Sequence, residues 1–181
     1  PMPYIFSQNG PISRTVRDAA TLLQVMAGYD PRDPTSLRER PPDFGAAVDR
    51  GIEGLSIAWS PDFGFANVHP DVLEVTSSAA RVFEELGCHI EESDLVMDEP
   101  YDVFGPVQAA DSYASLGQYL ESHADLLTDF ARFFLEIGKR VTTAEYARSL
   151  GRIDALKARM TDLFEKYDLL LSPTACFPAF P

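Results

Sequence analysis

The chain has 181 residues, of which 15 are basic and 28 acidic, and its net charge is −13. With 45% apolar and 24% charged residues it has the composition of a folded globular protein, which excludes a wholly disordered chain. Because its negative charge repels phosphate groups and anionic lipid, we expect no nucleic-acid partner and no membrane partner.

The first quarter of the sequence predicts one helix between two loops. Residues 1–11 are rich in proline and predict a loop or an edge strand. Thr15 is placed to cap a helix whose apolar residues recur at helical spacing as far as Ala27, and Gly28 ends it. Four prolines in residues 31–49 predict a long surface loop.

A strand, a helix and a second strand follow. Residues 55–59 form a short apolar run that favours a strand. Pro70 suits the first turn of a helix that Gly87 ends, and residues 88–92 then alternate as a strand does. Two strands joined in this way lie parallel, around a right-handed crossover, so this segment predicts an α/β fold.

The remainder of the chain is predicted to be mainly helical. Residues 101–120 and 125–137 carry the apolar residues of two helices, and Thr142 with Glu145 forms a capping box that starts a third. The third helix carries one apolar stripe: Tyr146, Leu150, Ile153, Leu156, Met160, Leu163 and Tyr167. Burying seven such side chains is worth on the order of 10–20 kcal/mol gross. Residues 169–171 predict a buried strand.

The residues that usually carry chemistry form no recognisable group. His69, His89 and His123 lack metal-ligand spacing, so we expect no metal. There is no phosphate-binding glycine loop, so we expect no cofactor. The strained serine elbow G-x-S-x-G is absent, and Ser77 and Ser78 lie inside a predicted helix.

The cysteines favour a reducing compartment. Cys88 and Cys176 lie far apart and form neither a disulfide framework nor a paired zinc motif. We therefore expect a cytoplasmic protein. From the residues alone, the prediction ends at an α/β protein without a recognisable site.

Five blocks of the sequence resemble the amidase signature family in the family's own order. Residues 10–20 read GPISRTVRDAA, and residues 30–36 read DPRDPTS. Residues 52–58 read IEGLSIA, residues 83–88 read FEELGC, and residues 167–174 read YDLLLSPT. The resemblance extends over nearly the whole chain.

The resemblance implies both a fold and an activity. The family fold is a layered α/β/α sandwich around a mixed sheet, and residues 1–181 would be the C-terminal portion of a single amidase domain, incomplete at both ends. The family hydrolyses the C–N bond of carboxylic amides without metal or organic cofactor. A serine attacks the carbonyl, while a second serine and a lysine relay the proton.

No catalytic residue of the family can be placed on this sequence. The family's lysine and two serines precede the block that corresponds to residues 10–20, and the lysines present here come late in the chain: Lys139, Lys157 and Lys166. The helical segment after Pro100 resembles a wall of the family's acyl pocket. Gln108 and Ser112 on this segment are our candidates for the substrate pocket, and the alternative is that both are ordinary helix-surface residues.

Two functional hypotheses remain. The first is an amidase that acts on a small-molecule amide, with catalytic residues outside this chain and this segment inactive alone. The second is a non-catalytic truncated product or an interaction module with an amidase-derived fold. Part of a sandwich would expose a sheet edge and apolar surface, so we predict that the isolated chain forms a homo-oligomer or exchanges elements. Residues 59–64, WSPDFG, are more similar to stand-alone amidases than to the subunits of amidotransferases.

Overall fold

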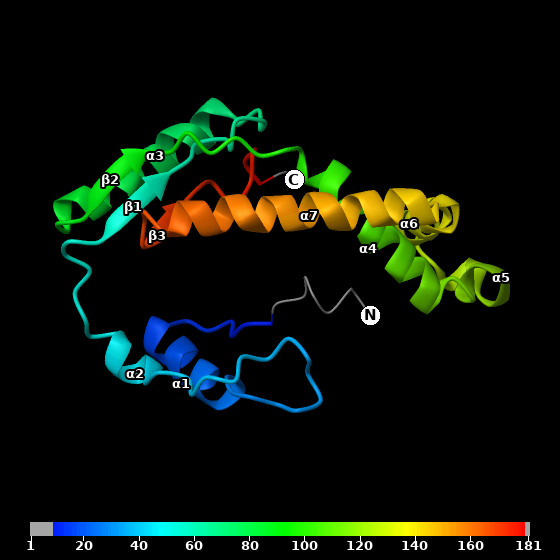
Figure 1. Ribbon diagram of the computed structural model, residues 1–181, viewed down its shortest axis with the longest axis horizontal. Helices are drawn as coiled ribbons and strands as arrows, with labels where there is room; N and C mark the ends of the chain where they lie inside the picture. The colour runs from blue at the N-terminus through cyan, green and yellow to red at the C-terminus, as the bar shows by residue number, and fades with distance from the viewer. Residues whose placement is uncertain (1–8, 180–181) are drawn as a thin grey trace. The chain divides into compact units, whose positions relative to one another are not determined.

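The computed structural model describes residues 9–179 (Figure 1). The chain divides into two compact units, Pro1–Gly51 and Ile52–Pro181. Most of the loop predicted at the start of the sequence lies outside the described residues. In the described part, no helix combines the length and the apolar character that a bilayer crossing needs.

The first unit is built on helix α1, Val16–Met26, which begins where the sequence predicts it. The Thr15 hydroxyl accepts a hydrogen bond from the backbone N–H of Asp18 at 3.1 Å and so caps the first turn. After the helix the chain turns at Gly28, whose φ of 149° is a conformation that side chains rarely adopt.

The loop predicted over residues 31–49 contains a short helix, α2, Phe44–Ala47, and in this respect the prediction was wrong. The Asp43 carboxylate caps α2 by accepting from the N–H of Ala46 at 2.9 Å. The N–H of Phe44 donates to the Gln24 side chain on α1 at 2.9 Å. These two bonds satisfy N–H groups that a one-turn helix cannot satisfy internally.

The second unit contains a parallel sheet of three strands in the order β2-β1-β3. The strands are β1, Ser56–Trp59, β2, His89–Glu92, and β3, Leu169–Leu171. Ile57 of β1 is in register with Ile90 on one side and with Leu169 on the other. The parallel pairing and the α/β class are confirmed, and the family's mixed sheet would need strands beyond these three.

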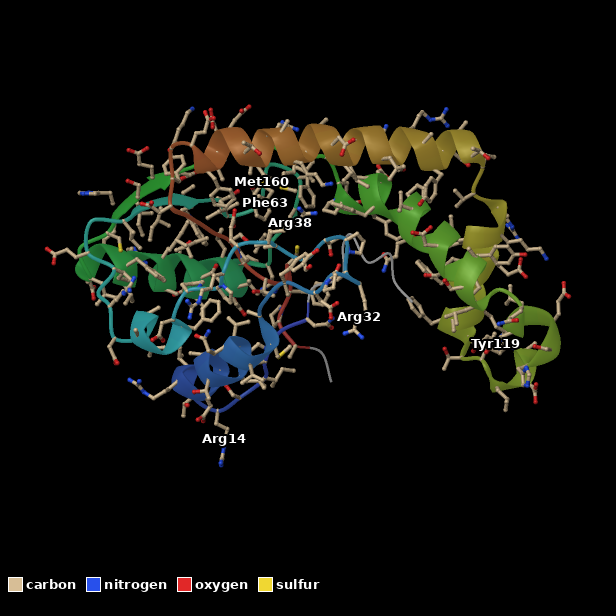
Figure 2. All side chains as sticks on the ribbon, turned by 60° about the horizontal axis from the view of Figure 1, so that its bottom comes forward. Arg14, Arg32, Arg38, Phe63, Tyr119 and Met160 are labelled. Carbon is tan, nitrogen blue, oxygen red and sulfur yellow. The ribbon has the colours of Figure 1, made fainter. Side chains whose placement is uncertain are left out.

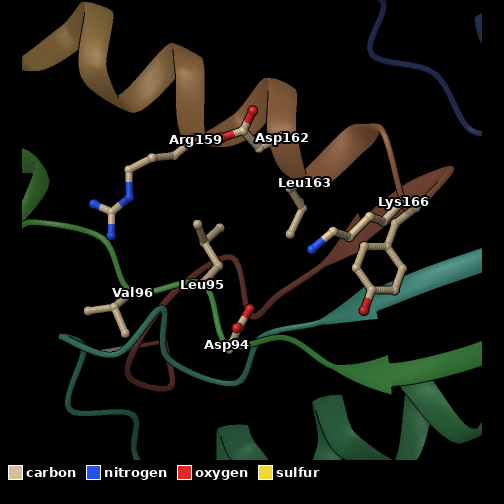
Figure 3. A pocket seen from close by; sticks show the side chains of 8 residues that line it. Asp94, Leu95, Val96, Arg159, Asp162, Leu163 and Lys166 are labelled. Carbon is tan, nitrogen blue, oxygen red and sulfur yellow. The ribbon is translucent and has the colours of Figure 1, made fainter.

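Helices cover both faces of this sheet. Ile57 and Ala58 are both fully buried, and because successive residues of a strand face opposite ways, each marks one face. On the face of Ala58, Leu95 and Leu163 form a core, and Figure 2 shows half-buried Phe63 and Met160 beside it. Helix α7, Thr143–Phe164, covers this face, and α3, Pro70–Glu85, covers the opposite one (Figures 1 and 3).

Helix α3 has the boundaries that its sequence signals indicate. Pro70 lies in the first turn, and His69 accepts a hydrogen bond from the N–H of Asp71 at its ring Nδ1, at 3.3 Å. The helix ends at Gly87, whose φ is 88°. Cys88 follows as a buried residue on the way into β2, so the prediction of this segment is confirmed within one residue at the strand start.

The segment between the second and third strands contains more breaks than its composition predicts. Helix α4 covers Pro100–Leu116 and is separated from the single turn of α5, Tyr119–Ser122. The short 3₁₀ helix η1, Ala124–Leu126, precedes α6, Asp129–Arg140. The observed helix α6 therefore starts four residues later than the helix predicted over residues 125–137. The Thr128 hydroxyl fixes its start by accepting from the N–H of Ala131 at 3.2 Å.

The long helix α7 confirms the predicted capping box and the predicted apolar face. The N–H of Thr142 donates to the Glu145 carboxylate at 2.8 Å, and the N–H of Glu145 donates to the Thr142 hydroxyl at 3.2 Å. None of the seven stripe residues is exposed, but only Ile153 and Leu163 are fully buried. The gross energy predicted for the stripe is therefore an upper bound.

The third strand is less buried than predicted. It pairs with β1 alone, so its other edge has no strand partner among the described residues. Leu169 is 40% exposed. The strand predicted over residues 169–171 is confirmed, but the prediction that it is buried was wrong. An apolar run alone cannot distinguish an edge strand from a central one.

Candidate functional site

Helices α4, α6 and α7 pack together at one end of the second unit, away from the sheet (Figure 1). Between them lies an open cavity of about 340 Å³. Its lining is mixed, with apolar walls and several charged side chains: Tyr101, Asp102, Gly105, Pro106, Ile137, Arg140, Val141, Glu145 and Arg152. It adjoins the segment that the sequence singled out for the substrate pocket.

A proline inside α4 leaves a backbone carbonyl beside this cavity without its helical partner. Pro106 has no N–H, so the carbonyl of Asp102 one turn earlier lacks its intrahelical donor. Arg152 of α7 supplies the replacement, since its Nη1 donates to the Asp102 carbonyl oxygen at 3.4 Å. The sequence analysis missed this contact, although a proline inside a helical pattern signals a carbonyl that needs a partner.

Two further contacts fix the positions of these helices. The Tyr146 hydroxyl on α7 donates to the Asp111 carboxylate on α4 at 3.1 Å. Gly138 of α6 lies directly against the backbone of Ala109 on α4, where a Cβ would meet the Ala109 carbonyl carbon at 2.7 Å. Helix α4 is therefore held against α6 by a close backbone contact and against α7 by a hydrogen bond.

The two pocket candidates lie on α4, and both are half-buried. Gln108 and Ser112 follow Tyr101 and Gly105 at the spacing of one helical face, since residues three and four apart on a helix are neighbours. Neither lines the cavity beside Pro106. The structure thus aligns them with two cavity residues on one face, without bringing either into the cavity.

A second cavity, of about 220 Å³, lies between α7 and the segment after β2 (Figure 3). Arg159 lies on its Val96 side and Lys166 on its Asp94 side. Carboxylates alternate with these cations, so the cavity favours neither an anion nor a cation.

A hydrogen bond joins Tyr167, which lines this cavity, to the sheet. The Tyr167 hydroxyl donates to the Glu91 carboxylate of β2 at 2.9 Å. This bond, with a smaller effect of burial, raises the pKa of Tyr167 above its usual value. The contact ties the segment after α7 to the sheet edge.

No lysine of the described residues is placed to activate a serine, whereas the exposed hydroxyl of Ser122 lies 2.8 Å from the ring Nδ1 of His123. Lys139 and Lys166 are exposed, and Lys157 pairs with Asp154 of its own helix at 3.8 Å. No hydrogen bond joins a lysine to a serine over residues 9–179. Within the same range, no group of three or more acidic, histidine or cysteine side chains could hold a metal ion.

The buried polar groups of the described part are all satisfied. No buried side-chain nitrogen or oxygen there lacks a hydrogen-bond partner. Ser60, which follows β1, is an example: its hydroxyl accepts from the N–H of Phe63 at 3.0 Å and holds a turn in which Phe63 has a φ of 53°. Such groups stabilise the fold.

Fold and site together define an α/β protein whose described part contains a parallel sheet and a cluster of three helices, α4, α6 and α7. A family model described as Amidase matches residues 1–181, and the chain belongs to this family. An acylamidase of Rhodococcus erythropolis is 33% identical over 184 residues, which cover 98% of this chain and 38% of the relative. One subunit of the glutamyl-tRNA(Gln) amidotransferase of Pseudomonas fluorescens is 32% identical, over 96% of this chain and 41% of that relative.

Solved structures agree with this assignment. The crystal structure of a bacterial aryl acylamidase of the amidase signature family superposes with a TM-score of 0.85 at 30% identity. The match covers 93% of this chain and 36% of that enzyme. The chain therefore spans about two fifths of the length of the relatives that it matches.

Proposed function

We propose that the chain is part of an amidase that hydrolyses the C–N bond of a small-molecule carboxylic amide. The observation that carries this proposal is the family match over the whole chain. The matched relatives are about two and a half times as long, so a catalytic centre has room outside the aligned segment.

The proposed mechanism is nucleophilic attack by a serine, with a second serine and a lysine relaying the proton, and all three lie outside this chain. It is supported by the order of the family's sequence blocks and by the isolation of the lysines in residues 9–179. This segment alone would then be inactive. We expect it to act in the cytoplasm, because both cysteines, Cys88 and Cys176, are free thiols.

We further propose that α4 forms one wall of the substrate pocket and that Gln108 and Ser112 face the acyl group of the amide. A half-buried amide and a half-buried hydroxyl on one helical face can each hydrogen-bond a substrate and fix its orientation. The close contact of Gly138 with Ala109 supports the proposal, because it holds α4 rigidly.

Two other assignments compete with this one. A non-catalytic interaction module is supported by the absence of a lysine–serine hydrogen bond in the described residues. A role within an amidotransferase complex is as well supported by identity as a role as an acylamidase, at 32% against 33%. Both alternatives predict no release of amine from simple amides without a further protein.

The test uses the natural full-length polypeptide. It is assayed for ammonia or aniline release from primary amides and acyl anilides, and a fluorophosphonate probe marks its nucleophilic serine for peptide mapping. The proposal requires hydrolysis, with the label on a serine outside residues 1–181. A label on a serine within this chain would refute the proposed mechanism, and no hydrolysis and no label would favour the interaction module.

Substitutions on α4 test the pocket separately. In the active polypeptide Gln108→Ala and Ser112→Ala should each raise KM by about tenfold, the cost of one lost hydrogen bond. The control is Gln118→Ala, an exposed glutamine just after the same helix, which should leave KM unchanged. Equal KM values for all variants would refute the pocket assignment and show that Gln108 and Ser112 are ordinary helix-surface residues.

A further inference from the structure

Helix α6 exposes an apolar stripe on the side turned away from α4. Leu135 and Gly138 are its buried residues and mark its inner side. Phe130 is 75% exposed and Phe133 is 65% exposed, and these two form the stripe, whereas half-buried Ile137 lines the cavity between α4, α6 and α7. Two aromatic side chains that are this exposed on one helix are typical of an interaction surface.

The charges beside the stripe are arranged with opposite signs at its two ends. Asp129 lies in the first turn of α6 and Arg140 in the last. Arg140 follows Asp129 by eleven positions, which is about three helical turns and about 16 Å, so both lie on the same flank of the stripe. Asp129 pairs with Arg132 of its own helix, yet its side chain remains 96% exposed and can accept a second donor.

We propose that α6 is a self-association surface, on which the α6 helices of two copies of this chain pack antiparallel around a twofold axis. Such an axis places Asp129 beside Arg140 of the partner subunit, and it does so twice. At the centre, the same axis brings Phe133 near Phe133 of the partner subunit. A parallel arrangement would instead put like charges beside one another at both ends, which costs free energy.

The exposed apolar area of the stripe is small compared with that of a stable interface. At about 150–250 Å² for each aromatic side chain, burying the exposed parts of Phe130 and Phe133 removes about 200–350 Å² per chain from water. Stable interfaces bury about 800 Å² per partner, so this pairing belongs to the weak, reversible class. The association is therefore expected to depend on protein concentration.

Sedimentation velocity of the full-length polypeptide over a range of concentrations tests the proposal. The expected result is a reversible dimer whose dissociation constant rises at least about tenfold in Phe133→Asp. The matched control is Phe177→Asp, since Phe177 is a phenylalanine of similar exposure outside any helix or strand. A monomer at every concentration, or a dimer equally weakened by both variants, would overturn the proposal.

Charge reversal tests the antiparallel orientation itself. Arg140→Asp should weaken the dimer about fivefold by placing two carboxylates together, and the double variant Asp129→Arg with Arg140→Asp should restore it. A parallel pair would gain nothing from the second substitution. Failure of the double variant to recover, with circular dichroism unchanged, would refute the antiparallel arrangement.

Discussion

Replacing Gly138 by alanine should destabilise the helical cluster, although alanine is the better helix former. The added Cβ would lie far inside van der Waals contact of the Ala109 carbonyl oxygen, and 2.8 Å from the Cβ of Tyr113. Both neighbours belong to α4, and the nearer one is backbone that no rotamer change can remove. Helices α4 and α6 would have to move apart.

The magnitude follows from two opposing effects. Overpacking costs up to about 3 kcal/mol, and a clash with backbone belongs at the upper end of that range. The higher helix propensity of alanine returns about 1 kcal/mol. The net loss in the free energy of unfolding is therefore about 2 kcal/mol, which lowers the urea midpoint by about 1 M for a slope of about 2 kcal/mol/M.

Gly151 provides a control of the opposite sign. It lies within α7, and a Cβ there would meet nothing within 4 Å. Gly151→Ala should therefore raise the free energy of unfolding by about 1 kcal/mol, the difference in helix propensity, and so raise the midpoint by about 0.5 M. Urea unfolding followed by far-ultraviolet circular dichroism measures both variants. If Gly138→Ala were as stable as the parent, or more stable, the close approach of α4 and α6 would be refuted.

Three further predictions concern single contacts in the second unit. Arg152→Ala should lower the free energy of unfolding by about 1 kcal/mol, because it leaves the Asp102 carbonyl without a donor. The loss should be smaller in the Pro106→Ala background, where the alanine supplies the missing N–H, and a double-mutant cycle of urea unfolding measures the difference. Hydrogen bonds from Thr142, the backbone N–H first, lower the pKa of Glu145, so its stabilising effect is present above its ordinary pKa and lost as the pH falls through its folded pKa. The melting temperature of Glu145→Gln should accordingly depend less on acid pH than that of the parent. The phenol of Tyr167 has a raised pKa, so its contribution is present below its ordinary pKa and lost as the pH rises through its folded pKa, and Tyr167→Phe should remove that alkaline dependence.

Each of these predictions can fail separately. Equal costs of Arg152→Ala with and without the proline would show that its guanidinium does not serve the Asp102 carbonyl. Parallel acid profiles for Glu145→Gln and the parent would refute the role of the capping box. An unchanged alkaline limb in Tyr167→Phe would mean that another tyrosine carries it.

The elements whose signals are local could be predicted from the sequence. The Thr15 cap, the capping box at the start of α7 and the glycine end of α3 each depend on residues within one turn of one another. The parallel strands around α3 followed from the same signals and the handedness of βαβ units. The resemblance added the family, which the residues alone could not supply.

The features that depend on distant parts of the chain could not be predicted. The burial of β3 depends on which strands flank it, and its sequence records only that it is apolar. The start of α6 at Asp129 was missed for a different reason, because Thr128 caps the helix locally and the apolar pattern alone placed the start at residue 125. The cavity beside Pro106 brings together three helices that are separate in sequence, so the local signals of Pro106 and Glu145 do not indicate it.

The intact mass of the natural polypeptide in its source cells, with peptide mapping, tests the central proposal most directly. The 181-residue chain has a mass of 20.0 kDa. The proposal predicts a mass far above this value, with peptides that carry a lysine and a Gly/Ser-rich segment ahead of the block at residues 10–20. A natural polypeptide of about 20.0 kDa without those peptides would contradict the assignment of an amidase and would leave an interaction module as the function to pursue.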